Sequence, residues 1–511
     1  MPSLGPLELD EAQFRAASGQ GNALVIAGPG AGKTRTLLAR AIFLMEEGVP
    51  PEDIFLLTFT VKTASELRER LEAFGVQGVR VDTFHGLAYE ICRLKGLSPR
   101  LLDTEVQEEI FKEILRRRGH PLRGARKKFE RLLAGPPDEE GLLSAYQEVL
   151  AREDLWDFHR LLREASSENP LGQTPCHLLV DEFQDLNKEL VSFLLSFGKA
   201  RFFLVGDPAQ AIYGFRGAHP EVVKDFVKAL EEPTVFFLPK SYRVPEKILS
   251  FANRLRETPF EVPPLEAQKP GGELLAFSYE RPEQEARGVA KQVEELLGGL
   301  QMEASKRGLS PGEIAVVARV RRLLEPVREA LAAAGIPLEE PSSLAEAHLA
   351  HLERVISQAK DLADLKRLLA TEEALPEVSF LLSRSRDLED FRARWHLLRL
   401  QATVLLKRSG VALLTIHETK GLEFKAVFLV GAEEGLLPFK LLSDFSPSEE
   451  KRLAYVAVTR AEAVFRATYS RRRTLFGKRL PGKISPFFSS LPMAEISPRR
   501  KPHRPRQGSL F

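Results

Sequence analysis

The feature that most constrains this chain is a glycine-rich segment near its beginning. The segment Gly28-Pro29-Gly30-Ala31-Gly32-Lys33-Thr34 follows the apolar run Ala23–Ala27 and precedes a helical stretch, Thr36–Met45. Glycines let backbone N–H groups converge on an anion, and the start of a helix adds the positive end of its dipole. Lys33 is then placed to reach β- and γ-phosphates, and the Thr34 hydroxyl to ligate Mg²⁺. A chance glycine turn would need neither the strand nor the helix, so the context predicts a Walker A loop that binds a nucleoside triphosphate.

Composition narrows the class of protein. A chain of 511 residues is long enough for roughly three or four domains, and its 43% of apolar and 28% of charged residues are typical of a globular protein. Residues 1–10 do not resemble a secretion signal. No apolar run reaches about 18 residues, the length that a membrane-spanning helix needs. The content of two cysteines is typical of proteins in a reducing compartment. We therefore expect a cytoplasmic protein. The balance of 73 basic against 71 acidic residues indicates no particular partner.

Alternating strand and helix patterns predict an α/β fold. Strands are expected at Leu24–Ala27, Ile54–Thr58, Val79–Val81, His177–Val180, Phe202–Val205, Thr234–Leu238, Glu273–Phe277, Glu313–Ala318, Ala412–Ile416 and Ala426–Val430. We predict two doubly wound parallel-sheet domains in tandem, each interrupted by a mainly helical insertion. The expected boundaries are 1–88 and 175–238 for the first domain, 89–174 for its insertion, 239–341 and 408–490 for the second domain, 342–407 for a short second insertion, and 491–511 for a disordered basic tail.

Two carboxylates follow the apolar run Leu178–Val180. The carboxyl ends of parallel strands are where such sheets bind ligands, which places Asp181 and Glu182 in a site. Asp181 is expected to hold Mg²⁺, and Glu182 to orient and deprotonate the water that attacks ATP. The alternative, an exposed acidic turn, is disfavoured by the Walker A loop on the same chain.

The segment after the next strand, Gly206–Ala218, combines an amide, two aromatic rings and a cation. Gln210 is placed to sense a γ-phosphate. Tyr213, Phe215 and Arg216 form an aromatic–cation cluster of the kind that grips single-stranded nucleic acid by base stacking and phosphate contact. Ordinary core packing is the alternative for the two rings, and the flanking glycines favour a loop instead.

These motifs and several others resemble, in the same order, the UvrD/Rep/PcrA family of superfamily 1 DNA helicases, from about Leu7 to Ser485. The matching segments are Leu9–Gln13, Gly28–Thr34, Leu57–Ala64, Asp82–Gly86, Asp181–Asp185, Gly206–Ala218, Ser241–Arg243, Thr415–Phe424 and Ala454–Ala461. The resemblance implies that the two α/β domains are RecA-like parallel-sheet P-loop domains. It further implies an ATP-dependent motor that moves 3′-to-5′ on single-stranded DNA and unwinds duplexes, in repair or replication. It also implies ATP and Mg²⁺ as cofactors, and single strands and strand junctions as partners of a monomeric motor.

The resemblance assigns roles to individual residues. Those implied to bind nucleotide are Gln13, Gly28, Gly30, Ala31, Gly32, Lys33, Thr34, Arg35, Tyr242 and Glu423, with Gln13 reading adenine and Tyr242 stacking on it. Those implied to be catalytic are Lys33, Asp181, Glu182, Gln210, Arg243 and Arg460, with Thr34 and Asp181 on the metal. Those implied to contact DNA are Phe59, Lys62, His85, Tyr213, Phe215, Arg216 and His417.

Arg243 and Arg460 are expected on the second α/β domain, across a cleft from the Walker residues. There they would stabilise charge on the transferring phosphoryl group only when the domains close. Hydrolysis would remove the charge that holds the cleft shut, which is a motor stroke.

The chain departs from the family in two places. Phe215 stands where the family usually has Trp, which weakens stacking there. The second insertion, 342–407, is short where relatives carry a large, rotating one. We therefore expect a compact motor with weak unwinding of its own.

The last five residues suggest a partner. Gln507-Gly508-Ser509-Leu510-Phe511 resembles the peptide by which bacterial proteins dock on the sliding clamp, with Gln507, Leu510 and Phe511 as contacts. A frayed tail whose arginines hold DNA phosphates is the alternative.

Two other functions remain open from the sequence. One is a translocase that strips proteins from DNA with little unwinding. The other is an ATP-switched DNA-binding clamp, which needs fewer catalytic groups than Glu182, Arg243 and Arg460 provide.

Overall fold

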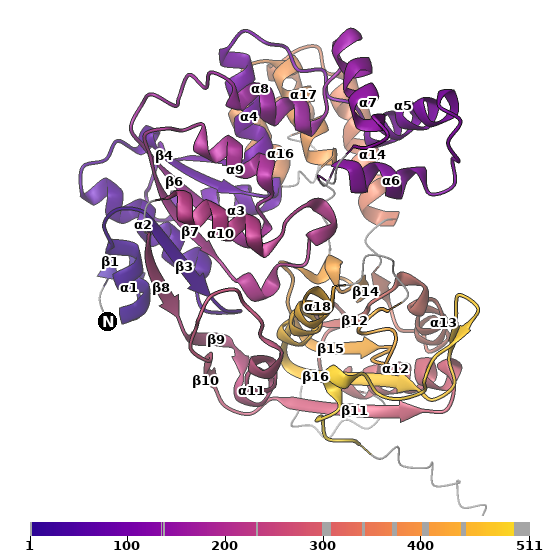
Figure 1. The fold of residues 1–511 in the computed structure, drawn as a ribbon. Helices are drawn as coiled ribbons and strands as arrows, with labels where there is room; N and C mark the ends of the chain where they lie inside the picture. The colour runs from indigo at the N-terminus through magenta and orange to yellow at the C-terminus, as the bar shows by residue number, and fades with distance from the viewer. Residues whose placement is uncertain are drawn as a thin grey trace, which may run out of the picture. The chain divides into compact units, whose positions relative to one another are not determined.

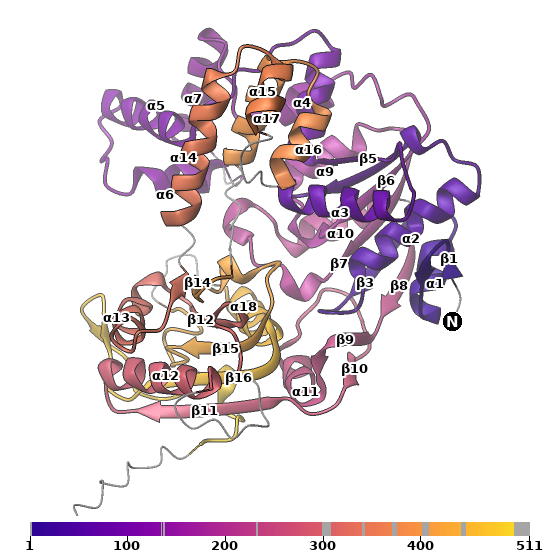
Figure 2. The same ribbon diagram turned by 180° about the vertical axis from the view of Figure 1, so that it is seen from behind.

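The structure of the chain is a computed structural model. It describes residues 3–133, 135, 138–230, 233–298, 308–339, 343–369, 376–400, 408–440 and 446–494. Contacts divide the chain into two compact units. Unit 1 comprises Met1–Pro270, Glu340–Leu406 and Lys451–Thr459, and unit 2 comprises Gly271–Glu339, Lys407–Glu450 and Arg460–Phe511. Each unit carries a six-stranded sheet whose pairings are all parallel, which confirms the predicted α/β class with tandem parallel-sheet domains (Figures 1 and 2).

The sheet of unit 1 has the strand order β5-β4-β6-β7-β3-β8. Its strands are β3 (Ala23–Ala27), β4 (Ile54–Thr58), β5 (Arg80–Thr83), β6 (Cys176–Asp181), β7 (Ala200–Gly206) and β8 (Thr234–Leu238). Val205 on β7 pairs with Val25 on one side and with Asp181 on the other. The loops that follow β3 and β6 therefore both leave the sheet at the carboxyl ends of its strands, with only β7 between them. Parallel sheets bind ligands at these carboxyl ends.

Helices cover both faces of this sheet, because successive strand residues point to opposite sides. One face, including Val25 and Leu56, packs against α1 (Glu11–Ser18), α2 (Lys33–Glu46) and α3 (Val61–Ala73). The other face, including Leu24 and Leu178, packs against α4 (Phe84–Leu94), α8 (Phe158–Ser166), α9 (Lys188–Leu195) and α10 (Pro220–Ala229). Burial on both faces explains why these strands are continuous apolar runs in the sequence.

The first insertion is helical, as predicted. Its helices α5 (Thr104–Arg117), α6 (Ala125–Leu133) and α7 (Leu142–Arg152) enclose a small core of their own. The Phe129 ring lies 4.6 Å from that of Phe111 and 4.8 Å from that of Tyr146, measured between centroids.

The sheet of unit 2 has the order β11-β16-β15-β12-β14-β13. Its strands are β11 (Glu273–Tyr279), β12 (Ile314–Ala318), β13 (Leu338–Glu339), β14 (Val411–Thr415), β15 (Phe424–Val430) and β16 (Ala461–Ser470). Helices α12 (Pro282–Leu296) and α13 (Glu325–Ala333) follow β11 and β12, and α18 (Pro447–Thr459) precedes β16. Two short hairpins lie outside the two large sheets, β1 (Ser3–Leu4) with β2 (Leu7–Glu8) and β17 (Thr474–Leu475) with β18 (Lys478–Arg479). The strands β9 (Lys240–Pro245) and β10 (Glu266–Lys269) form a separate parallel pair.

Strand β16 was not predicted from the sequence, although it lies between β11 and β15 inside the sheet. Its charged residues Glu462 and Arg466 interrupt the apolar pattern that marks the other strands. Both are neutralised in the fold, since Glu462 pairs with Lys425 and Arg466 with Glu273.

The compact units divide the chain differently from the predicted boundaries. Residues 239–270, expected in the second domain, belong to unit 1 with β9 (Lys240–Pro245), α11 (Glu246–Leu255) and β10 (Glu266–Lys269). The second insertion belongs to unit 1 as well, as α14 (Ser343–Gln358), α15 (Leu362–Leu369), α16 (Pro376–Arg384) and α17 (Leu388–Leu400). In Figure 2 the orange helices α16 and α17 lie beside α3 and α4, and apolar residues of the insertion join the core of unit 1. Sequence order placed the insertion with its flanking strands, whereas side-chain packing places it with unit 1.

Among the described residues, no helix has both the length and the apolarity needed to span a membrane.

Candidate nucleotide and nucleic-acid sites

The glycine-rich loop lies between β3 and α2, as the sequence predicted. Gly30 and Gly32 have φ of +71° and +84°, values that side chains other than glycine rarely adopt. Space is also restricted, because a Cβ at Gly30 would lie 2.5 Å from the Cβ of Arg243, and one at Gly32 would lie 2.4 Å from Nε2 of Gln13. Arg243 and Gln13 therefore approach the loop backbone so closely that these two positions accept only glycine without rearrangement.

The predicted lysine and carboxylate of the site lie together. The Lys33 Nζ is 2.8 Å from Oε1 of Glu182. Glu182 directly follows β6 and has a φ of +52°, which is strained for a glutamate and is typical of functional sites. Burial and the neighbouring Glu182 carboxylate raise the pKa of Asp181, although Lys33 acts in the opposite direction.

The residues expected to hold Mg²⁺ fit that ion. Thr34 supplies a hydroxyl and Asp181 a buried carboxylate, and oxygen atoms are the ligands that Mg²⁺ prefers. Burial raises the pKa of Asp181, and a cation beside this carboxylate would favour its charged form. In the part of the chain that the structure describes, no cluster of three or more His, Cys, Asp or Glu side chains is arranged to hold a metal. Mg²⁺ needs fewer protein ligands than that, because it keeps water and binds phosphate oxygens.

A chain of hydrogen bonds leads from Glu182 to the segment after β7. The Gln184 amide Nε2 donates to Glu182, and its Oε1 accepts from the backbone N–H of Asp207 at 3.0 Å. Oδ2 of Asp207, a fully buried residue, accepts from Nε2 of Gln210 at 2.8 Å and from the hydroxyl of Tyr455 at 3.1 Å. The predicted γ-phosphate sensor Gln210 is thus tied to the carboxylate that would activate water.

The residues expected to bind adenine gather at the start of α1. Asp10 and Gln13 form a capping box, in which the Gln13 N–H donates to Oδ1 of Asp10 and the Asp10 N–H donates to Oε1 of Gln13. Nε2 of Gln13 donates to the carbonyl of Ala31 at 3.0 Å, and the Tyr242 hydroxyl donates to Oδ2 of Asp10 at 2.7 Å. The Tyr242 side chain is 42% exposed, which leaves its ring accessible to a base. Arg35 instead binds the backbone carbonyl of Glu8 at 3.0 Å.

Arg243 belongs to unit 1, which corrects the prediction that places it on the second domain. The strand that carries it, β9, is hydrogen-bonded to the glycine-rich loop. The Tyr242 N–H donates to the carbonyl of Gly30 at 2.9 Å, and the Ser241 hydroxyl donates to that of Pro29 at 2.7 Å. Arg243 therefore lies beside the loop in the same unit.

The other candidates after residue 270 lie in unit 2. His417 lies in a 3₁₀ turn after β14, and Glu423 directly precedes β15. Arg460 directly precedes β16, is 3% exposed, and donates from Nη1 to the carbonyl of Leu422 at 3.2 Å. Their roles toward ATP and DNA stay predictions.

The aromatic–cation cluster exists in the structure. The rings of Tyr213 and Phe215 lie 6.0 Å apart, edge to face, and the Arg216 guanidinium carbon lies 5.3 Å and 5.5 Å from their centroids. Phe215 is 50% exposed, so it is a surface residue and the core-packing alternative is wrong for it.

The earlier DNA candidates begin the helices α3 and α4. Phe59 packs on Phe84 with ring centroids 4.9 Å apart, and Lys62 lies in the first turn of α3. The ring centroid of His85 is 4.2 Å from that of Phe158. Burial lowers the pKa of His85 to about 4, and nearby His159 acts in the same direction. His85 is thus neutral at pH 7 and supplies a hydrogen bond or a ring rather than a charge.

Four residues that organise these sites lie in the matching segments but had no role assigned to them from the sequence: Asp10, Asp207, Ser241 and Tyr455. The spacing of Asp10 and Gln13 before a helical pattern is a capping-box signal and was available. The contacts of Asp207 with Tyr455 and of Ser241 with Pro29 join positions about 200 residues or more apart, so no local pattern marks them. The predicted clamp peptide, with Gln507, Leu510 and Phe511, lies outside the described residues.

Comparisons with known proteins cover both units. The family model described as an AAA domain matches residues 10–216, and that of the UvrD-like helicase C-terminal domain matches residues 339–472. The chain is 26% identical over 630 residues to DNA helicase II of Escherichia coli (strain K12), covering 94% of this chain and 87% of that protein. It is 25% identical over 655 residues to ATP-dependent DNA helicase PcrA of Staphylococcus epidermidis (strain ATCC 12228 / FDA PCI 1200), covering 95% and 88%.

Proposed function

Because the chain is a UvrD/PcrA-like protein, which an AAA domain, a UvrD-like helicase C-terminal domain and the likeness to DNA helicase II and PcrA along nearly all of its length support, we propose that it is an ATP-dependent DNA helicase. In this proposal it is a DNA-stimulated ATPase that moves 3′-to-5′ along single-stranded DNA as a monomer and separates strands ahead of it. The names of its relatives and the order of its motifs support the activity. The direction of movement rests on the family resemblance.

The observation that best supports ATP hydrolysis is the pairing of Lys33 with Glu182 beside the glycine-rich loop. A protein that only binds ATP needs the loop and the lysine. Hydrolysis also needs a carboxylate that orients and deprotonates water, and a sensor that links it to the phosphate. Glu182 supplies the carboxylate, and Gln184, Asp207 and Gln210 connect it to the segment that carries the aromatic cluster.

Mg²⁺, when bound, would neutralise charge on the phosphate oxygens. Thr34 and Asp181 would hold it, through their hydroxyl and carboxylate oxygens. The chain's own contribution to turnover is then to place Lys33 against the phosphates and Glu182 against the water. Arg243, on the strand packed against the loop, would stabilise developing charge on the γ-phosphate, and Arg460 is proposed to do so as well.

The aromatic–cation cluster suits a motor that must pass any sequence. Base stacking on a ring such as Phe215 contributes about 1–3 kcal/mol per base and is tolerant of sequence. Arg216 adds a positive charge for the phosphate backbone, close to both rings.

The function is tested with the Glu182→Gln variant. We expect it to retain ATP binding and to lose about 10²- to 10⁴-fold in DNA-stimulated hydrolysis, because it lacks the general base. Glu221→Gln is the matched control, since Glu221 is an exposed glutamate in the first turn of α10. Hydrolysis by Glu182→Gln within tenfold of the wild type would overturn the assignment.

Direction and unwinding are tested together on partial duplexes with 3′ or 5′ tails. Strand separation on the 3′-tailed substrate only, with ATP, is the expected result. Hydrolysis without strand separation on either substrate would identify a translocase that does not unwind.

We further propose that Gln507, Leu510 and Phe511 dock on a sliding clamp. Their resemblance to a clamp-binding peptide supports this. Deleting residues 507–511 is expected to abolish binding to the clamp in a pull-down assay and to leave DNA-stimulated ATPase unchanged. Retained binding would refute it.

A further inference from the structure

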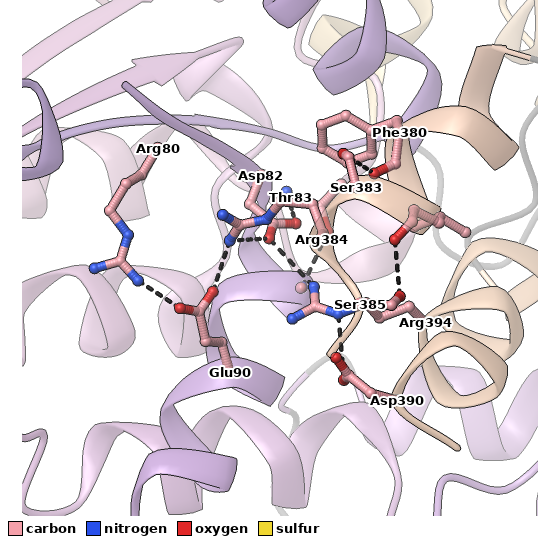
Figure 3. A network of polar contacts seen from close by, with 12 residues as sticks. Arg80, Asp82, Thr83, Glu90, Phe380, Ser383, Arg384, Ser385, Asp390 and Arg394 are labelled. Carbon is pink, nitrogen blue, oxygen red and sulfur yellow. Dashed lines mark hydrogen bonds and ion pairs between the residues drawn. The ribbon is translucent and has the colours of Figure 1, made fainter. Parts of the chain in front are cut away.

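A charged network joins the second insertion to the rest of unit 1 (Figure 3). Nη2 of Arg384, at the end of α16, lies 3.0 Å from Oδ2 of Asp82 and 2.6 Å from Oε2 of Glu90. Arg394, on α17, lies 3.5 Å from the same oxygen of Asp82 and 3.3 Å from Oδ1 of Asp390. Asp82, Arg394 and Asp390 are each no more than 5% exposed. One arginine of the insertion thus bridges two carboxylates of unit 1, and a second arginine supports it.

The charged groups of this network, between the second insertion and the rest of unit 1, shift the pKa values of one another. Burial opposes ionisation of Glu90, but the attraction of Arg384 and Arg80 outweighs it and lowers the pKa of Glu90. Burial likewise opposes the charged form of Arg384, but Asp82 and Glu90 raise its pKa. Both groups are therefore charged at neutral pH, and the network holds as a set of ion pairs.

Apolar packing surrounds this network and also attaches the insertion. Phe380 and Trp395 are buried in the same core as Leu67 and Leu71 of α3, and Leu397 joins the core that includes α4. Ions are costly to bury, and apolar residues of similar volume often give an equally stable joint. The ion pairs differ from apolar contacts in being directional, so they fix the position of the carboxylate that they hold.

Asp82 in turn positions the backbone of the turn between β5 and α4. Its Oδ1 accepts from the backbone N–H of Thr83 at 2.7 Å, and the Thr83 hydroxyl accepts from the N–H of Gly86 at 3.0 Å. The carboxylate is packed against the first turn of α4, because a Cβ at Gly86 would lie 2.0 Å from its Oδ1. The start of α4, which carries His85, thus rests on Asp82 and the Thr83 cap.

We propose that Arg384 is a positioning residue for DNA binding by unit 1. It acts from the second insertion, through Asp82, on the turn Thr83–Gly86. The insertion is in this respect a fixed part of the DNA-binding face of unit 1. This inference rests on the proposed function, since the turn is a predicted DNA contact.

The test compares Arg384→Gln with Arg399→Gln. Arg399 lies on α17, is exposed, and pairs with Glu353 within the insertion, so it matches Arg384 in chemistry and location but not in partner. ATPase is measured against the concentration of an oligo-dT single strand. Arg384→Gln is expected to raise the half-saturating DNA concentration about tenfold while the KM for ATP changes less than twofold. Arg399→Gln is expected to change neither.

Two further variants separate positioning from general damage. Arg384→Lys keeps the charge but cannot bridge two carboxylates as a guanidinium does, so a rise of about threefold is expected. Asp82→Asn combined with Arg384→Gln is expected to raise the half-saturating concentration by less than the product of the single changes, because both act through one contact.

Two results would count against these ideas, and they are distinguishable. The positioning role would be overturned if the half-saturating DNA concentration were the same in Arg384→Gln and Arg384→Lys as in the control Arg399→Gln. A wild-type ATPase that single-stranded DNA does not stimulate would overturn the proposed function itself.

Discussion

The Gly30→Ala substitution tests the close packing of the nucleotide loop against β9. Gly30 has a φ of +71°, and an added Cβ would lie 2.5 Å from the Cβ and 3.0 Å from the backbone nitrogen of Arg243. These atoms cannot move by a side-chain rotation. Either β9 shifts away, or the loop does.

The cost has two parts. An L-residue in the left-handed region costs about 1–2 kcal/mol, and an overpacked methyl group costs about 1–3 kcal/mol. A loop that retreats instead loses the hydrogen bond from the Tyr242 N–H to the Gly30 carbonyl, which contributes about 0.5–1.5 kcal/mol. We therefore expect the free energy of unfolding of unit 1 to fall by about 2–5 kcal/mol. Because the displaced loop is the proposed phosphate-binding site, the ATP dissociation constant is expected to rise about tenfold or more, which corresponds to about 1.4 kcal/mol or more.

Gly75→Ala is the matched control, since Gly75 has a φ of +75° and a Cβ there would meet nothing within 4 Å. In Gly75→Ala the free energy of unfolding should fall only by the cost of the left-handed backbone conformation, about 1–2 kcal/mol, and ATP should bind normally. Urea unfolding followed by tryptophan fluorescence measures both variants, because Trp156 and Trp395, the two tryptophans, belong to unit 1. A fluorescent ATP analogue reports affinity. Equal loss of stability and unchanged ATP binding in the two variants would refute the close-approach argument.

Three further results are expected. Phe215→Ala should weaken binding to single-stranded DNA by about 1–3 kcal/mol for poly-dT and mixed sequences alike in fluorescence anisotropy, and a loss confined to one sequence would contradict stacking. Tyr455→Phe removes a hydroxyl donor from the buried Asp207 carboxylate, so the free energy of unfolding should fall by about 1.5–3 kcal/mol, and an unchanged urea midpoint would show that this bond contributes nothing. Burial raises the pKa of Cys92 to about 12 and that of Cys176 to about 11. Both thiols should therefore react slowly with Ellman's reagent at pH 8 and rapidly in urea. Rapid labelling of the folded protein would contradict their burial.

The second insertion shows how sequence order and packing can disagree. Its helices lie in the chain between β13 and β14 of unit 2, which is why the sequence predicts it as part of that domain. Side chains such as Phe380 and Arg384 instead find their partners on α3, β5 and α4. Both the apolar core and the ion pairs of that joint connect positions about 300 residues apart, and no periodicity within the insertion identifies them.

Arg243 illustrates the same limit at the nucleotide site. The motif Ser241-Tyr242-Arg243 was recognisable, and its residues do lie near the glycine-rich loop. Its assignment to the second domain was wrong, because β9 forms hydrogen bonds with the loop in unit 1. A local motif identifies the chemistry that a residue such as Arg243 can perform. The residues that it contacts depend on the tertiary structure, which here brings β9 next to the glycine-rich loop.

The sequence by itself determined the α/β class, the glycine-rich loop, the carboxylates after β6 and the aromatic cluster. Each is local: apolar runs make buried strands, glycines permit positive φ, and the strand before a motif places it at the sheet edge. Only the tertiary structure decided that Glu182 pairs with Lys33, that Asp207 joins Gln210 to Tyr455, and that the second insertion holds Asp82. These contacts depend on burial and on distances between segments far apart in the chain, and a linear pattern carries neither.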